Sequence, residues 1–127
     1  MPRVFQPRTI GRRQNDRSSP RDRGYDALWD RKARRYRKDN PFCERCAQFG
    51  RIRFGEALDH KFPVQDGGKI HCDKAGVWHL CRVCHGWKQN LEAYARRTDQ
   101  MERIVEWCDN PASRPRMRGD LALPLPE

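Results

Sequence analysis

Residues 80–88 read LCRVCHGWK, and in this stretch Cys81 and Cys84 are separated by two residues. A second pair with the same spacing, Cys43 and Cys46, lies nearer the N-terminus, with residues 47–80 between the pairs. A two-residue gap lets both thiolates of one turn reach a single ion, and two such turns complete a tetrahedral zinc site. Because the usual spacer is about 15–20 residues, we expect an inserted structural element. Four thiolates leave no position for water, so the zinc would be structural.

Two further cysteines, Cys72 and Cys108, are expected to be free thiols. The first residues, MPRVFQPRTIGRR, contain no apolar segment of the kind found in secretory signal peptides, so disulfide bonds are not expected. The sequence also contains no run of about 18 apolar residues, which excludes a transmembrane helix. The alternative to the zinc site is a set of four unrelated buried cysteines.

An aspartate and two histidines near these cysteines suit the hydrolysis of a phosphodiester. Asp59 and His60 lie in ALDHKFP, residues 57–63, and His85 directly follows Cys84. The reaction needs a base to deprotonate water and a divalent cation to stabilise charge on the phosphate and the leaving oxygen. Asp59 and His85 suit the cation, and His60 suits the base. Because successive side chains of a strand point to opposite sides, we expect distinct roles for Asp59 and His60.

These segments occur in the order Cys-x-x-Cys, LDHKFP, Gly-Gly and LCRVCHGWK. Together they resemble the HNH endonucleases of the ββα-metal group, in particular the small zinc-containing HNH proteins of tailed phages and prophages. The resemblance covers about residues 25–97. It implies an α+β fold in which a small strand-strand-helix core, stapled by a structural zinc on four cysteines, is flanked by helices and loose termini.

The resemblance also implies roles for single residues. His60 would be the general base, and Asp59 and His85 would hold one divalent cation. Lys88, one turn after His85, would contact a phosphate. The ligands of the structural zinc would be Cys43, Cys46, Cys81 and Cys84.

One position departs from the pattern of the family. The family has an asparagine five residues before the third cysteine, where this chain has Gly76. In the family this asparagine mostly orients the base histidine by a hydrogen bond, so its absence bears on catalytic efficiency. Asp73 and His79 are the candidates to compensate for it.

Positive charge is concentrated near the N-terminus. The 127-residue chain has 27 Lys and Arg and 17 Asp and Glu, a net charge of +10. Residues 1–38 hold 13 basic and 4 acidic residues, a net charge of +9, which leaves +1 for residues 39–127. A basic arm attracts nucleic acid through its phosphates, and the alternative is a solvated tail. The candidate phosphate contacts, for which a solvated helix face is the alternative, are Arg34, Arg35 and Arg37.

The length allows one small domain between two loose ends. We expect a disordered basic arm over residues 1–24, the nuclease domain over 25–108 and a Pro-rich tail over 109–127. Within the domain we expect irregular strand structure over 51–59, a hairpin or loop over 57–75, a helix over 80–97 and a further helix capped by Thr98. A basic helix over 25–38 would have an apolar seam of Tyr25, Leu28, Trp29, Lys32 and Tyr36.

Two functions are compatible with these features. We expect a metal-dependent endonuclease that nicks or cuts duplex DNA with little sequence preference, using Mg²⁺, Mn²⁺, Ni²⁺ or Zn²⁺ besides the structural zinc. The alternative is a zinc-knuckle DNA-binding protein with a decayed nuclease centre, which only Gly76 supports. The resemblance further implies that the protein acts in phage DNA packaging, with terminase or other packaging proteins as partners. The expected location is the bacterial host cytoplasm. Because no apolar run is long enough to span a bilayer, no membrane partner is expected.

Overall fold

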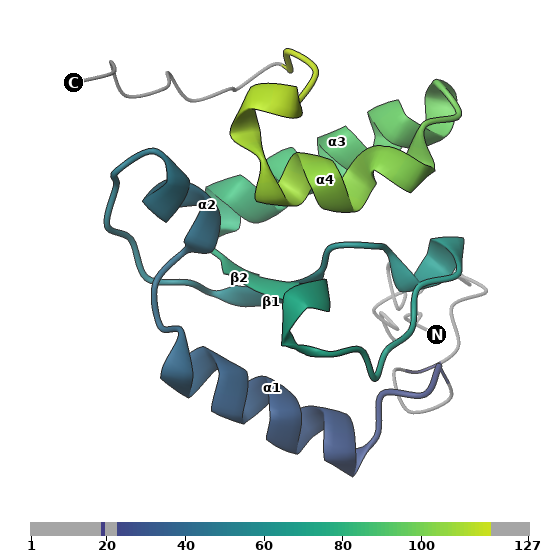
Figure 1. Ribbon diagram of the computed structural model, residues 1–127. Helices are drawn as coiled ribbons and strands as arrows, with labels where there is room; N and C mark the ends of the chain where they lie inside the picture. The colour runs from purple at the N-terminus through teal and green to yellow at the C-terminus, as the bar shows by residue number, and fades with distance from the viewer. Residues whose placement is uncertain (1–18, 20–22, 118–127) are drawn as a thin grey trace, which may run out of the picture.

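A computed structural model of the chain describes residues 19 and 23–117 (Figure 1). In this part the strands are β1 (Ala57–His60) and β2 (Val77–Leu80). The helices are α1 (Ala27–Asp39), α2 (Glu44–Gln48), α3 (Arg82–Arg97) and α4 (Ile104–Asp109). Short 3-10 turns lie in the connections, namely η1 (Val64–Asp66), η2 (Lys74–Gly76), η3 (Met101–Arg103) and η4 (Pro111–Ser113). The predicted α+β class is confirmed.

The two strands form an antiparallel hairpin whose register pairs Ala57 with Leu80 and His60 with Val77. Helix α1 lies on one side of the hairpin, and α3 and α4 lie on the other (Figure 1). Because α3 directly follows β2, the order β1, β2, α3 is the strand-strand-helix unit that the resemblance implied. The element inserted between the two cysteine pairs is therefore this hairpin with its long connection, residues 61–76.

The core lies between the hairpin and the two C-terminal helices. Leu91 of α3, Ile104 and Trp107 of α4, and Trp78 of β2 are all buried in one cluster. The four paired cysteines belong to the same cluster. The apolar core of this strongly charged chain is thus continuous with the candidate zinc site.

The helix predicted over residues 25–38 is confirmed as α1. Its first turn is capped by Asp26, whose Oδ1 accepts a hydrogen bond from the backbone N–H of Trp29 at 2.9 Å. The predicted seam was wrong for Leu28, which is 43% exposed, whereas Ala33 is buried. Trp29, Ala33 and Tyr36 follow the spacing i, i+4, i+7 that faces the hairpin, and Leu28 falls outside this stripe.

The last helix begins later than predicted. Thr98 ends α3 and does not cap a new helix, because its hydroxyl donates to the Tyr94 carbonyl at 2.8 Å. The next residue, Asp99, has a positive φ of 54°, which interrupts right-handed helix. The turn η3 follows, and α4 starts only at Ile104.

The termini fall largely outside the described residues. The structure does not describe residues 1–18 and 20–22 of the predicted arm or residues 118–127 of the predicted tail. The three-part division of the chain therefore stays a prediction. None of the helices in residues 19 and 23–117 combines the length and the apolar character needed to cross a membrane.

Candidate functional site

The four paired cysteines meet in one buried cluster. Their Sγ atoms all lie within 4.8 Å of one another, and all six cysteines of the chain are free. The Sγ atom of Cys46 lies 3.8 Å from that of Cys81 and 3.6 Å from that of Cys84. A tetrahedron with Zn–S bonds of about 2.3 Å requires sulfur–sulfur distances of about 3.8 Å. The cluster therefore fits a zinc ion in its dimensions, its burial and its donor atoms.

Hydrogen bonding and burial set the protonation of these thiols. A hydrogen bond from the Cys84 thiol lowers the pKa of Cys43 to about 4, and the same bond raises the pKa of Cys84. Burial raises the pKa of Cys46 to about 11. Since zinc binds thiolates, its binding must release protons from this cluster.

A buried arginine brings positive charge to the cluster. Arg45 is 1% exposed, and its Nη1 donates a hydrogen bond to Cys84 Sγ at 3.3 Å. Its guanidinium also lies over the Trp87 ring, 3.8 Å from the ring centroid. Four thiolates around Zn²⁺ leave two negative charges, which burial disfavours. Arg45 offsets part of that charge.

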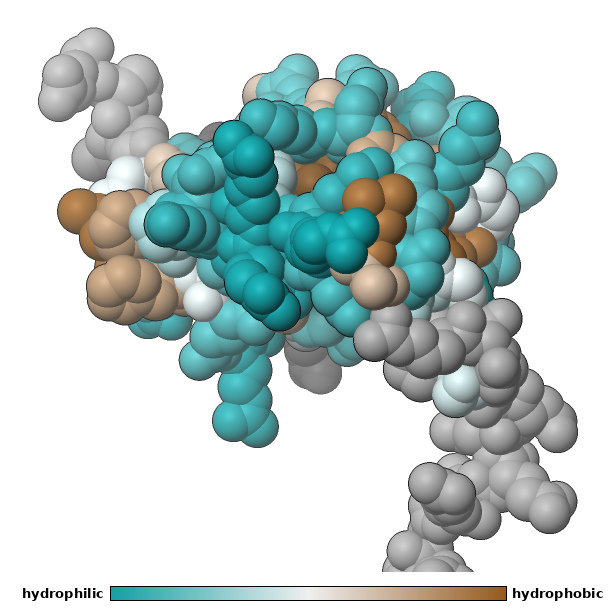
Figure 2. Space-filling view, turned by 90° about the horizontal axis from the view of Figure 1, so that it is seen from below, coloured by the Kyte–Doolittle hydropathy of each residue, from teal (hydrophilic) through white to brown (hydrophobic). Residues whose placement is uncertain are grey.

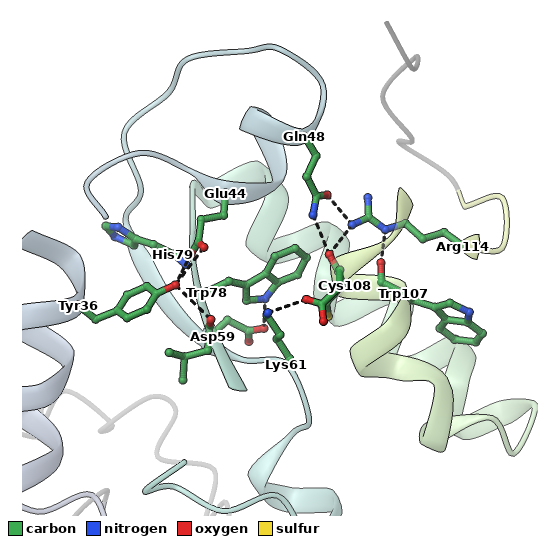
Figure 3. Close-up of polar contacts among 12 residues, drawn as sticks. Tyr36, Glu44, Gln48, Asp59, Lys61, Trp78, His79, Trp107, Cys108 and Arg114 are labelled. Carbon is green, nitrogen blue, oxygen red and sulfur yellow. Dashed lines mark hydrogen bonds and ion pairs between the residues drawn. The ribbon is translucent and has the colours of Figure 1, made fainter. Parts of the chain in front are cut away.

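Asp59 is held by one carboxylate oxygen and presents the other to His85. Its Oδ2 accepts a hydrogen bond from Trp78 Nε1 at 2.9 Å, from the opposite strand (Figure 3), and pairs with Lys88 Nζ at 2.9 Å. Its Oδ1 lies 3.8 Å from Nε2 of His85 in the first turn of α3. Strand β1 and helix α3 thus bring together one oxygen and one nitrogen that suit a divalent cation.

His60 contacts the opposite side of the hairpin. Its ring stacks on Trp29 of α1, with centroids 4.6 Å apart and an interplanar angle of 21°, and meets Tyr25 at 6.1 Å. Its Nε2 lies 3.0 Å from the carbonyl oxygen of Ile70. When Nε2 carries the hydrogen and donates a hydrogen bond to that carbonyl, Nδ1 keeps its lone pair. This is the state in which a general base accepts a proton.

Both sides of the hairpin open onto one cleft. Asp59, His60 and His85 all line an open cleft of about 810 Å³. The first two are the last residues of β1, where the chain leaves the hairpin, so side chains on opposite faces reach the same space. Arg23 and Arg96 also line the cleft. His85 and the Asp59–His60 pair, predicted from two segments of the sequence, therefore line the same cleft.

A neighbouring thiol occupies the space around Gly76. A Cβ atom at this position would lie 2.7 Å from Cys72 Sγ, so a larger side chain would force a displacement. His79 does not take over the role of the missing asparagine, because its Nδ1 is bonded to the Asn40 carbonyl at 2.7 Å. In the described part of the chain the hydrogen-bonding partner of the base candidate is the Ile70 carbonyl.

The predicted phosphate contact of Lys88 does not fit its position, because its side chain is 0% exposed. Besides Asp59, its Nζ contacts the carbonyl of His60 at 3.1 Å and the carboxylate of Glu92 at 3.4 Å. Lys88 therefore connects β1 to α3 beneath the cleft. The other candidate phosphate contacts are exposed on α1, namely Arg34, Arg35 and Arg37.

Several residues that hold the site were missed by the sequence analysis. The Ile70 contact is made by a backbone carbonyl, which no side-chain pattern reveals. Trp29 was expected to dock α1, and its stack on His60 joins segments that lie far apart in the chain. Trp78 lies opposite Asp59 in the hairpin register, a pairing that the structure shows and the sequence patterns did not specify.

In comparisons with known proteins, no family model and no curated protein matches this chain. Among solved structures, it is similar to the HNH endonuclease of the deep-sea thermophilic bacteriophage GVE2, whose crystal structure was determined with a manganese ion. The match covers 65% of this chain and 98% of that one, with 21% sequence identity and a TM-score of 0.40.

Proposed function

We propose that this protein is a metal-dependent endonuclease that hydrolyses phosphodiester bonds in DNA. The observation that carries the proposal is the cleft that Asp59, His60 and His85 line together. A base and a pair of cation ligands at one cleft are what this hydrolysis requires. The net charge of +10 favours a polyanionic substrate.

His60 acts as the general base in this proposal. Because its Nε2 is held by the Ile70 carbonyl, Nδ1 takes the proton from the attacking water. The Trp29 stack restricts rotation of the ring and keeps Nδ1 in one orientation. The activated water attacks in line with the leaving 3′ oxygen, so the products carry 5′-phosphate and 3′-hydroxyl ends.

Asp59 and His85 hold the divalent cation. A bound cation there supplies positive charge that stabilises the phosphate and the leaving oxygen. Trp78 and Lys88 engage Oδ2 of Asp59, which leaves Oδ1 as the ligand atom. Mg²⁺, Mn²⁺, Ni²⁺ and Zn²⁺ all accept such oxygen and nitrogen donors.

The cysteine cluster holds a structural zinc in the same proposal. Its four sulfur ligands leave no coordination position for water or substrate. Zinc binding there contributes directly to the folding free energy of a chain with a small core. The zinc therefore positions β2 and α3, on which His85 and the partners of Asp59 lie.

The second candidate is a DNA-binding protein whose nuclease centre has decayed, and the observation that favours it is Gly76 in place of the family's asparagine. Against it stands the Ile70 carbonyl, which orients the base candidate without that side chain. Phage DNA packaging, packaging proteins as partners and a cytoplasmic location belong to the proposal on the strength of the resemblance alone.

Plasmid relaxation tests the proposed function. Supercoiled DNA is incubated with zinc-loaded protein, with and without Mg²⁺, Mn²⁺ or Ni²⁺, beside the variants His60→Ala and His71→Ala. His71 is the matched control, because it is a partly exposed histidine that does not line the cleft.

We expect nicking that requires the added cation, is lost in His60→Ala and persists in His71→Ala. If the wild-type protein binds the plasmid but leaves it supercoiled with every cation, the nuclease proposal fails for this chain. The DNA-binding function would then be the better description.

A further inference from the structure

A ridge of apolar side chains stands out from the first cysteine pair. We call Phe42, Ile52 and Phe54 the apolar ridge; they are 46%, 84% and 70% exposed. The two phenylalanine rings stack on each other with centroids 5.3 Å apart. In the described part of the chain, the other exposed large hydrophobic residues are Leu28 and Val83. Figure 2 shows apolar surface at one edge of a face that is otherwise mostly hydrophilic.

The backbone under the ridge is fixed by hydrogen bonds. Phe42 and Phe54 face each other in an antiparallel bridge. On either side of it, the Cys43 N–H donates to the Arg53 carbonyl at 2.7 Å and the Gly55 N–H donates to the Pro41 carbonyl at 2.9 Å. The exposed rings therefore sit on the backbone that carries a candidate zinc ligand. A surface held in this way is ready for a partner without further ordering.

The charge around the ridge is positive. Between residues 41 and 56 the exposed charged side chains are Arg51, Arg53 and Glu56, so their net charge is positive, and the two arginines alternate with Ile52 and Phe54. Successive side chains of an extended segment point to opposite sides. The segment thus presents an apolar edge and a cationic edge. A second copy of the chain is a poor partner, since its own two arginines would meet these.

We propose that the apolar ridge is a second DNA-contacting surface, which places Phe54 and Ile52 against a base step of duplex DNA. Proteins that bend DNA insert phenylalanine and isoleucine side chains between base steps from the minor groove. Arg51 and Arg53 contact the adjacent phosphates, as arginines do in most DNA complexes. Duplex DNA provides both the apolar base faces and the negative charge that the two edges require.

The ridge lies within reach of a duplex bound at the cleft. Phe54 and Asp59 are five positions apart in the sequence, so their Cα atoms are at most about 18 Å apart at the extended limit of about 3.6 Å per residue. This length corresponds to about five base pairs at 3.4 Å each. This inference rests on the proposed DNA substrate. The ridge would add a contact that bends or unstacks the DNA near the scissile phosphate.

The test measures binding without cleavage, in zinc-loaded full-length protein and with no added divalent cation. A duplex with a fluorescent end label reports the dissociation constant by anisotropy, and 2-aminopurine placed at successive positions reports unstacking. The variants are Phe54→Ala, Ile52→Ser and Arg53→Gln. Because Ile52 is 84% exposed, Ile52→Ser should fold like the wild type, and a loss of binding in this variant would report on the ridge itself. Val83→Ser, on a residue 61% exposed outside the ridge, is the matched control.

We expect Phe54→Ala and Ile52→Ser to weaken binding about 5- to 30-fold and to abolish the rise in 2-aminopurine fluorescence. Arg53→Gln should weaken binding and lower the slope of log K against log salt concentration by about 1. Val83→Ser should bind like the wild type. Ridge variants that are folded, bind within twofold of the wild type and leave 2-aminopurine unchanged would overturn the proposal, and the ridge would then fit a protein partner better. Because no cleavage is involved, ridge-dependent binding stands even if plasmid relaxation fails.

Discussion

The cysteine cluster and the cleft differ in how exposed their candidate ligand atoms are to solvent. All four cysteines of the cluster are buried, and they supply a full tetrahedral set. The cleft offers two ligand atoms, Asp59 Oδ1 and His85 Nε2, and the His85 side chain is 36% exposed. A closed site with four ligands suits a structural ion, whereas an open site with two ligands leaves room for water and phosphate.

The residues around the two sites also differ between the closed cluster and the open cleft. Next to the cluster, Arg45 adds a positive charge that would offset the negative charge of four thiolates around a zinc ion. Next to the cleft, Lys88 and Trp78 engage only one oxygen of Asp59 and leave the other available. The difference is the basis of our proposal that one hairpin and one helix hold a closed structural ion site and an open reactive site side by side.

The largest expected effect comes from breaking the closed site. Cys81→Ser removes one zinc ligand, and structural zinc contributes about 10–16 kcal/mol of apparent binding free energy in small zinc-finger peptides. We expect the variant to lose zinc, measured by atomic emission, and to lose its cooperative thermal transition, measured by circular dichroism. Cys72→Ser, outside the cluster, should keep both properties. A Cys81→Ser variant that melts like the wild type would show that zinc does not hold this fold.

Removing the buried ammonium group comes next. Lys88→Met removes the cation paired with the partly buried Asp59 and leaves the buried Glu92 with only Arg96, at 3.8 Å. We expect the free energy of unfolding in urea to fall by about 3–5 kcal/mol. Arg35→Met is the control, because Arg35 and Asp39 form an ion pair in which both side chains are exposed, and such pairs contribute about 1 kcal/mol or less. Equal losses in the two variants would contradict the role of Lys88 beneath the cleft.

The aromatic stack on the base gives a smaller effect, confined to the cleft. We expect Trp29→Ala to lower kcat about 10- to 100-fold, as loss of a group that orients a site residue does, with little change in KM. Trp29→Phe should recover most of the rate because it keeps a ring over His60. The measurement is steady-state nicking, with zinc content as a check on the closed site. A change in KM alone would indicate that Trp29 contacts DNA and does not position the base.

The smallest effect concerns the pH dependence of stability. Burial raises the pKa of Glu92 above its usual 4.5. The contribution of this carboxyl group to stability is therefore fully present below about pH 4.5 and is lost as the pH rises through the raised pKa. In urea unfolding at several pH values, Glu92→Gln should show a smaller fall in stability toward neutral pH than the wild type. An unchanged pH profile would place the titrating group elsewhere.

Local patterns predicted the parts of the molecule that local chemistry determines. The spacing of the cysteines predicted the cluster, because a two-residue gap brings two thiolates to one side of a turn. The proline at residue 41 accounts for the end of α1 at Asp39, because the residue before a proline avoids the helical region. The motif around Asp59 and His60 predicted residues that line one cleft, although the catalytic roles of these residues stay predictions.

Contacts between distant segments were not predictable in the same way. The burial of Lys88 depends on the packing of α3 against β1, whereas its position one turn after His85 had predicted a phosphate contact. The stack of Trp29 on His60 joins residues 31 positions apart. Alternating apolar residues suggested a strand around Ile52 and Phe54, yet both side chains are exposed, since no element in residues 19 and 23–117 covers that edge.

The most direct test of the distinction between the two sites is Mn²⁺ binding, measured by electron paramagnetic resonance in zinc-loaded wild type and Asp59→Asn. We predict that the wild type binds one Mn²⁺ per chain in addition to one zinc. In Asp59→Asn, the Mn²⁺ affinity should fall about tenfold or more, an effect of the size seen when the surroundings of metal ligands are altered, while the zinc content is unchanged. Equal Mn²⁺ binding by both proteins, or displacement of the zinc by Mn²⁺, would contradict the division into a closed structural site and an open catalytic one.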